Sequence, residues 1–309
     1  MYRYVVIRVM QGVVTLFVAS VVIFGLVRLT GDPVTMMLSE FAGPEEREAM
    51  TRYLGLDRPL PEQYWAFISN AVRWDLGDSL RYRKPVGELL LERFPATIKL
   101  TGAAVLASLL ISIPAGVLAA TKRNRWQDII AKGFAILGQS VPTFWLGIVL
   151  IQVFAVYFGL LPAGGYGGGK IIYWILPAIT LGYHSTAGVL RLTRSAMLDV
   201  LDTDYVRLAR IKGVPEGLVI RKHALRNALI PVVTFSGVIY VRWLAGSVVT
   251  ETIFAWPGVG RLAYESVMYR DFPMMQGLIM IFVGLYVVFN LVIDILYCYL
   301  DPRIRYVKE

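Results

Sequence analysis

Six apolar runs dominate this 309-residue sequence, and each is long enough to cross the ~30 Å hydrocarbon core of a bilayer. They lie at residues 9–29, 100–120, 134–158, 173–192, 229–249 and 277–300. The chain is 56% hydrophobic and only 17% charged, which is too apolar for an ordinary soluble domain of this length. The runs therefore predict an all-α polytopic membrane protein with six transmembrane helices.

Lys and Arg residues are distributed unequally between the loops that alternate along these runs. The N-terminus, the 121–133 and 191–228 loops and the tail carry about 17 of them, whereas the short opposite loops, 159–172 and 250–276, carry about three. The 30–98 loop is left out of this count, because loops longer than ~60 residues cross largely regardless of charge. Because positively charged loops stay in the cytoplasm, we expect both termini there, with the 30–98 loop outside. The first run has no small-x-small cleavage site, so we expect it to remain a membrane helix and not a signal peptide.

Several classes of function lack the residues that they need. The net charge of +9 lies beside apolar runs without an aromatic-basic module, which does not indicate nucleic-acid binding. The phosphate-cradling pattern GxxxxGK[ST] is absent, and the glycine run 164–169 lacks its lysine and hydroxyl residue. Ser108, Ser112 and Asp294 form no catalytic group for an intramembrane enzyme. With two histidines and the single Cys298, we expect no metal site.

The outer loop and the runs carry further helix signals. Pro44, followed by acidic residues and ending at Gly55, predicts one helix, and a second is predicted from Pro61. The second has an apolar face that either packs on neighbouring helices or lies on the membrane surface. Prolines inside the apolar runs predict kinks, where small residues either line a path or let helices approach closely; they are Pro114, Pro142 and Pro177.

A short polar segment, residues 203–231, separates two of the apolar runs. Thr203 or Asp204 suits a helix cap, Gly213 suits a left-handed stop, and Pro215 suits the first turn of another helix. Ala209 and Gly213 lie four residues apart and are expected to share a face that a partner approaches closely. Spacing alone fits a solvated basic loop equally well.

The segment resembles the EAA-type loop of ABC importer permeases, in the variant that peptide-transporting members carry. The match is the run 209–213, Ala-Arg-Ile-Lys-Gly, followed by the run 223–231, His-Ala-Leu-Arg-Asn-Ala-Leu-Ile-Pro. The general motif's glutamate position falls on Arg207 and its first alanine on Leu208, which weakens any role for a carboxylate there. The resemblance implies that this loop contacts an ATPase through Asp204, Tyr205, Arg207, Ala209, Arg210, Lys212 and Gly213.

Nearly the whole chain is similar to the B-type permease of dipeptide and oligopeptide importers. The matching motifs begin at residues 31, 55, 76, 140, 191, 250 and 301. The resemblance implies a type I ABC importer permease fold in a bacterial plasma (inner) membrane, and transport by alternating access. It also implies a second homologous permease, two cytoplasmic ATPases that hold the ATP and Mg, and an external solute-binding protein. No enzyme activity or cofactor is expected in this chain.

The resemblance divides the chain into three parts. We expect a first transmembrane helix with an external helical loop at 1–96, a permease core at 97–300 that contains the coupling loop 203–231, and a cytoplasmic tail at 301–309. It also implies an outer gate near residues 250–260, formed by Glu251, Phe254, Trp256, Pro257 and Gly258.

Polar residues inside the apolar runs are the candidates for a substrate pathway. An intramembrane arginine costs at least about 2.5 kcal/mol unless it is paired or hydrated, and Arg242 lies near the middle of the fifth run. It either contacts a substrate carboxylate or is paired structurally, with Glu251 or with the second permease. Gln139 and Ser140 either face the pathway or satisfy the helix that Pro142 interrupts.

Two alternatives to a peptide importer remain open on the sequence. One is an ion-coupled secondary carrier that works without ATPase partners. The other is a related ABC importer for glutathione, a nickel chelate or a sugar-derived solute, because similar permeases serve all of these substrates.

Overall fold

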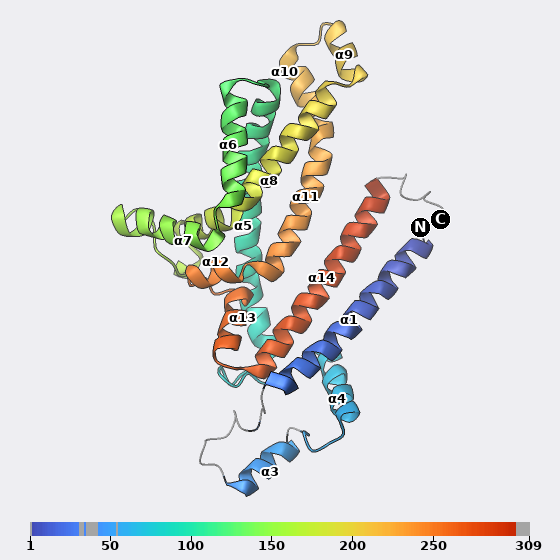
Figure 1. Ribbon diagram of the computed structural model, residues 1–309, viewed down its shortest axis with the longest axis vertical. Helices are drawn as coiled ribbons and strands as arrows, with labels where there is room; N and C mark the ends of the chain where they lie inside the picture. The colour runs from blue at the N-terminus through green and yellow to red at the C-terminus, as the bar shows by residue number, and fades with distance from the viewer. Residues whose placement is uncertain (1, 31–33, 35–42, 54, 301–309) are drawn as a thin grey trace. The chain divides into compact units, whose positions relative to one another are not determined.

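The computed structural model describes residues 2–30, 34, 43–53 and 55–300, and within them the regular secondary structure is helical apart from one isolated bridge between Asp78 and Pro85. The all-α expectation is confirmed. The helices (Figure 1) are α1 Tyr2–Thr30, α3 Pro44–Tyr53, α4 Leu60–Val72, α5 Val86–Thr121, α6 Trp126–Ser140, α7 Thr143–Leu150, α8 Ile175–Leu201, α9 Asp204–Ile211, α10 Glu216–Leu218, α11 Leu225–Gly246, α12 Val248–Ile253, α13 Val259–Met268 and α14 Phe272–Leu300. The motifs at 31–33 and 301–303 lie outside the described residues.

All six predicted runs are helical over most of their length, but they differ in apolar character. Within the described residues, four helical stretches are long and apolar enough to cross a membrane, and the α6–α7 pair makes a fifth if it counts as one span. The predicted fourth run lies in α8, which has 27 residues but falls outside this apolar set. Many polar side chains of α8 are buried against neighbouring helices, among them Thr180, Thr186 and Thr193.

The kink predicted at Pro142 is present, and it divides the predicted span at 134–158 into two helical segments. α6 ends at Ser140, and α7 leaves it at an angle of 103°. The cause is Pro142, which has no N–H to donate and disfavours helical geometry at the preceding Val141. Val141 accordingly has extended dihedral angles, φ −85° and ψ 122°. By contrast, α5 continues through Pro114 and begins at Val86, well before the predicted start at 100.

The chain forms two compact units, residues 1–94 with 262–309, and residues 95–261. In the first, α1 and α14 pack side by side, and α1 begins at the end of the unit where α14 finishes (Figure 1). Gly12 permits the contact, since a Cβ there would lie 2.8 Å from Val287 Cγ1. The domain division predicted at 96 and 300 stays a prediction.

Helix α4 packs on the C-terminal half of α1. The Tyr64 hydroxyl lies 2.7 Å from that of Ser20, and the Tyr64 ring meets Phe24 edge to face at 5.3 Å between centroids. The packing interpretation is therefore confirmed for this face of α4. Trp65 and Val72 are 72% and 83% exposed and point elsewhere.

In the second unit, α8 is the central helix and packs against α6, α7 and α11. Small residues bring the helices together: a Cβ on Gly138 would lie 2.6 Å from Ala187 Cβ, and one on Gly182 would lie 2.9 Å from the Ala104 carbonyl oxygen. Figure 1 shows α9, α10 and the α5–α6 turn at one end of this unit, with α7 and α12 toward the other. The two candidate sites lie at these opposite ends.

Candidate functional site

The 203–231 segment folds as a compact helical loop between α8 and α11. Thr203 has the extended geometry of a cap, with φ −75° and ψ 153°, but its hydroxyl donates to the Val200 carbonyl and leaves the cap unmade. Gly213 has φ +75°, the left-handed conformation predicted for it, and its N–H donates to the Arg210 carbonyl at 3.0 Å. Pro215 precedes the first helical residue of α10 by one position. The predicted helix-turn-helix is confirmed, and the capping hydroxyl is the exception.

An apolar cluster fills the inside of this loop. Val206 and Val219 are fully buried, and Ala209 is buried against them. The expectation that Ala209 shares an open face with Gly213 is therefore wrong, because the Ala209 side chain points into the loop. Gly213 itself is exposed, and a Cβ there would meet no atom within 4 Å.

Polar bonds fix the loop on its remaining sides. Arg210 forms two bonds with the Glu216 carboxylate, at 2.8 Å from Nη2 and 3.1 Å from Nε, which raises the pKa of the Arg210 guanidinium. Asn227 at the start of α11 donates to the Tyr205 hydroxyl at 2.8 Å. Arg210 and Tyr205, both candidate ATPase contacts, thus also form bonds within the loop that stabilise its fold.

The outward face of α9 is apolar at its centre and charged at its edges. Leu208 is 51% exposed and Ile211 is 81% exposed, and they are flanked by exposed Arg207 and Lys212. Asp204, fully exposed, lies 3.6 Å from the Arg207 guanidinium. Sequence reasoning missed Leu208 and Ile211, although their spacing of three residues on a polar helix was the available signal.

At the opposite end of this unit, the 250–260 segment wraps around a buried carboxylate. Glu251 is fully buried and accepts hydrogen bonds from the Thr97 hydroxyl at 2.7 Å, the Ser247 hydroxyl at 2.8 Å and the Arg261 N–H at 2.9 Å. Burial raises the pKa of the Glu251 carboxyl, and the bonds from these donors act in the opposite direction. Gly258 lies directly against the carboxylate, where no side chain fits.

Aromatic packing holds the same segment in place. Trp256 is fully buried, donates from Nε1 to the Ala96 carbonyl at 2.9 Å and meets the rings of Tyr166 and Trp174 edge to face. Phe254 is also fully buried, and its carbonyl accepts a 2.7 Å bond from the N–H of Gly165 in the glycine run. The predicted gate residues therefore lie at the centre of a closely packed segment. Thr97, which bonds to Glu251 there, was not indicated by the sequence.

The candidate pathway residues are not brought together. Arg242 is exposed on α11 and forms no ion pair among the described residues, and its expected partner Glu251 bonds to Thr97, Ser247 and Arg261 instead. Structural pairing of Arg242 with Glu251 is therefore wrong. Gln139 accepts a long 3.4 Å bond from Arg191, and the Ser140 hydroxyl donates to the Ile136 carbonyl in the last turn of α6. The side chain of Asp294 lies outside the described residues.

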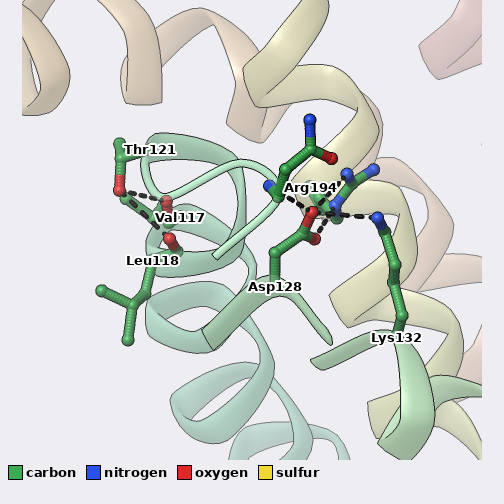
Figure 2. Close-up of polar contacts among 7 residues, drawn as sticks. Val117, Leu118, Thr121, Asp128, Lys132 and Arg194 are labelled. Atoms are coloured by element: carbon green, nitrogen blue, oxygen red, sulfur yellow. Dashed lines mark hydrogen bonds and ion pairs between the residues drawn. The ribbon is translucent and has the colours of Figure 1, made fainter. Parts of the chain in front are cut away.

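A second buried carboxylate lies near the coupling loop, and sequence reasoning missed it. Asp128 in the first turn of α6 is fully buried and contacts Arg194 of α8 and Lys132 of its own helix (Figure 2). Asp128 falls in the basic 121–133 loop, where only Lys and Arg were considered, and Arg194 lies 66 residues away along the chain. Only the i,i+4 spacing of Asp128 and Lys132 was visible in the sequence.

The chain matches two family models over most of its length. Residues 1–101 match the model described as "Binding-prot-dependent transport system membrane comp, N-term", and residues 112–306 match "Binding-protein-dependent transport system inner membrane component". The chain belongs to this family of binding-protein-dependent inner-membrane transport components. It is a multi-pass permease subunit of an ABC importer, and its partners are a binding protein and ATPases that hydrolyse the ATP.

Similar proteins agree with this family assignment. The chain is 43% identical over 307 residues to the glutathione transport system permease protein GsiC of Escherichia coli strain K12, covering 99% of this chain and 100% of that protein. The protein of the same name from Shigella dysenteriae serotype 1 (strain Sd197) matches equally. A crystal structure of an amino acid ABC transporter with histidines has a TM-score of 0.51 and 20% identity, covering 68% of this chain and 92% of that one. This last likeness concerns the fold.

Proposed function

We propose that this chain imports glutathione-sized peptides by alternating access, as one half of a heterodimer with a second homologous permease. The observation that carries the substrate class is the 43% identity over full length to permeases named for glutathione transport. Nickel chelates and sugar-derived solutes are the competing substrates. Two ATPase subunits drive the cycle, and selectivity is shared with the solute-binding protein.

The proposed orientation places both termini and the 203–231 loop in the cytoplasm. The distribution of Lys and Arg supports it, and the packing of α1 and α14, which begin and finish at the same end of their unit (Figure 1), supports placing the two termini on one side. In this orientation α9 presents Leu208 and Ile211 to the ATPase, with Arg207 and Lys212 at the edges. The previously named coupling residues Asp204, Tyr205, Arg210 and Gly213 shape and surround that face.

The segment around Glu251 and Trp256 forms the proposed outer gate. Its packing against Thr97 and Ala96 of α5 joins it to a second transmembrane helix, so a movement of α5 carries the gate with it. Rigid-body exchange between inward and outward openings requires such joined elements. Arg242 is the proposed pathway contact for a peptide carboxylate, since it has no ionic partner among the described residues.

The test of this function is reconstitution of the permease pair with its ATPases and binding protein in liposomes. We expect glutathione uptake only when ATP and the binding protein are both supplied. Uptake by the permease without ATPases, driven by an ion gradient, would instead establish a secondary carrier. Mass spectrometry of the ligand that co-purifies with the binding protein tests the substrate class: a short peptide is expected, and a nickel chelate or sugar-derived solute would contradict it.

A further inference from the structure

Asp128 is enclosed by four donors that come from three parts of the chain. Arg194 of α8 reaches it with Nε at 2.6 Å from Oδ1 and with Nη2 at 3.0 Å from Oδ2. Lys132 Nζ lies 2.9 Å from Oδ2, and the N–H of Asn124 in the α5–α6 turn donates to Oδ2 at 3.0 Å. Figure 2 shows the Arg194 and Lys132 side chains converging on the Asp128 carboxylate.

The geometry is that of a fixed joint. A two-pronged arginine–carboxylate contact is stronger and more directional than a single ion pair. A buried carboxylate that loses its partner is strongly destabilising, so the pair resists separation. Arg194 is itself largely covered, at 19% side-chain exposure, whereas Lys132 is half exposed and contributes less to this resistance.

The joint lies at the point where α8 leads into the coupling loop. Arg194 precedes the last residue of α8, Leu201, by seven positions, and α9 begins at Asp204. Next to Arg194 in α8, Ala196 and Met197 are buried against Ala224 and Ala228, where the loop returns into α11. The end of α8 is therefore attached to the loop on one side and to α6 on the other.

Apolar contact alone does not fix α6 to α8 at this end. Further along, the helices meet through small residues, Gly138 against Ala187 and a cluster of Ala131 and Ala135 with Leu190. The Phe134 and Tyr183 rings also meet edge to face there, 5.6 Å between centroids, but this apolar contact is less directional than an arginine–carboxylate pair. Asp128 supplies a directional contact at the end nearest the loop.

We propose that the Asp128–Arg194 pair is a positioning joint that makes α6 follow α8 when the coupling loop moves, so that ATP-driven motion reaches the helix that Pro142 bends. This rests on the proposed coupling role of 203–231. Neither residue touches substrate or nucleotide in this role. Its loss separates ATP hydrolysis from transport and leaves each subunit's own chemistry intact.

The experiment measures substrate uptake per ATP hydrolysed in the reconstituted full importer. Asp128→Asn and the double variant Asp128→Asn with Arg194→Gln, which buries no unpaired charge, are expected to lower this ratio about tenfold, within the range of ordinary coupling energies. Asp128→Glu keeps a carboxylate and restores part of the ratio. Asp199→Asn, an exposed carboxylate on α8, is the matched control and leaves the ratio unchanged. An unchanged ratio in assembled Asp128→Asn importer overturns the proposal.

A second measurement does not depend on transport. Nitroxide labels at exposed Trp126 on α6 and Ser195 on α8, in a Cys298→Ser background, report the distance between these helices with and without ATP. We expect a constant distance in the parent and a nucleotide-dependent change of several ångströms, on the order of a small helix shift, in the double variant. A distance that stays constant in both contradicts the joint.

A loop variant separates this proposal from the proposed function. Leu208→Glu, placed on the exposed face of α9, disrupts an apolar contact with the ATPase and is expected to abolish coupling. If Leu208→Glu uncouples and Asp128→Asn does not, only the joint is wrong. If neither uncouples, the coupling role of the loop itself is contradicted.

Discussion

Two buried carboxylates, Asp128 and Glu251, form polar contacts that join distant segments of the second unit. Each gathers donors from distant parts of the chain, Asp128 from α8 and Glu251 from Thr97 on α5. Burying a carboxylate is costly unless its oxygens are bonded, so both residues are sensitive to any change in their surroundings. One lies near the coupling loop and the other at the proposed gate, which places strong polar contacts at both ends of the unit.

The gate carboxylate gives a residue-scale prediction. In Gly258→Ala the new Cβ overlaps the Glu251 carboxylate, so the segment must shift and its hydrogen bonds lengthen. We expect a loss of about 1–3 kcal/mol in stability, the usual range for overpacking a buried site, and reduced uptake. Thermal unfolding of the purified complex measures it. Gly237→Ala on α11, where a Cβ meets nothing within 4 Å, is the control; equal effects of the two variants would refute the buried-carboxylate account.

Arg242 supports a second residue-scale prediction. Arg242→Ala is expected to leave assembly intact and to lower uptake roughly tenfold or more, as loss of a hydrogen bond to a charged group implies. Co-purification of the subunits and the uptake rate are measured together, with exposed Arg123→Ala as the control. Normal assembly with normal uptake removes Arg242 from the pathway, and lost assembly shows that its partner is the second permease.

At the scale of elements, the contact of α6 with α8 depends on glycine. α6 offers a matched pair of positions, because a Cβ at Gly138 would lie 2.6 Å from Ala187 Cβ, whereas one at Gly133 would meet no atom within 4 Å. The two helices therefore approach closely at one glycine only. Small residues at helix interfaces are typical of membrane bundles, where packing replaces the hydrophobic effect as the source of stability.

Substitution by alanine is expected to have different effects at Gly138 and at Gly133. Gly138→Ala forces the helices apart and is expected to cost about 1–3 kcal/mol. Gly133→Ala is expected to be neutral or slightly stabilising, by up to roughly 1 kcal/mol, because alanine loses less backbone conformational entropy than glycine when it is fixed in a helix. Thermal unfolding of both variants in the same detergent distinguishes them. A Gly138→Ala protein as stable as Gly133→Ala would contradict the close packing of α6 on α8.

At the scale of the whole molecule, much of the fold follows from the sequence. The apolar runs and the helix that Gly213 ends were predicted, since each depends on local composition or turn geometry, whereas the segment around Trp256 was indicated by the family resemblance. A kink at Pro142 was predicted as well, but its angle of 103° was not, because proline marks a break whose direction depends on what α7 packs against. Arg194 as a partner of Asp128 and Thr97 as a partner of Glu251 were missed for a similar reason: they lie 66 and 154 residues away, at distances that spacing rules do not reach.

The central claim is that residues 203–231 face the cytoplasm and bind the ATPase. The most direct test places one cysteine at Ile211, the most exposed apolar residue of α9, and another at exposed Val72, in the loop proposed to be external, as a control. We predict that Ile211→Cys cross-links to the ATPase and resists a membrane-impermeant maleimide added outside, whereas Val72→Cys reacts with it. Labelling of Ile211→Cys from outside, with no cross-link to the ATPase, would contradict the account.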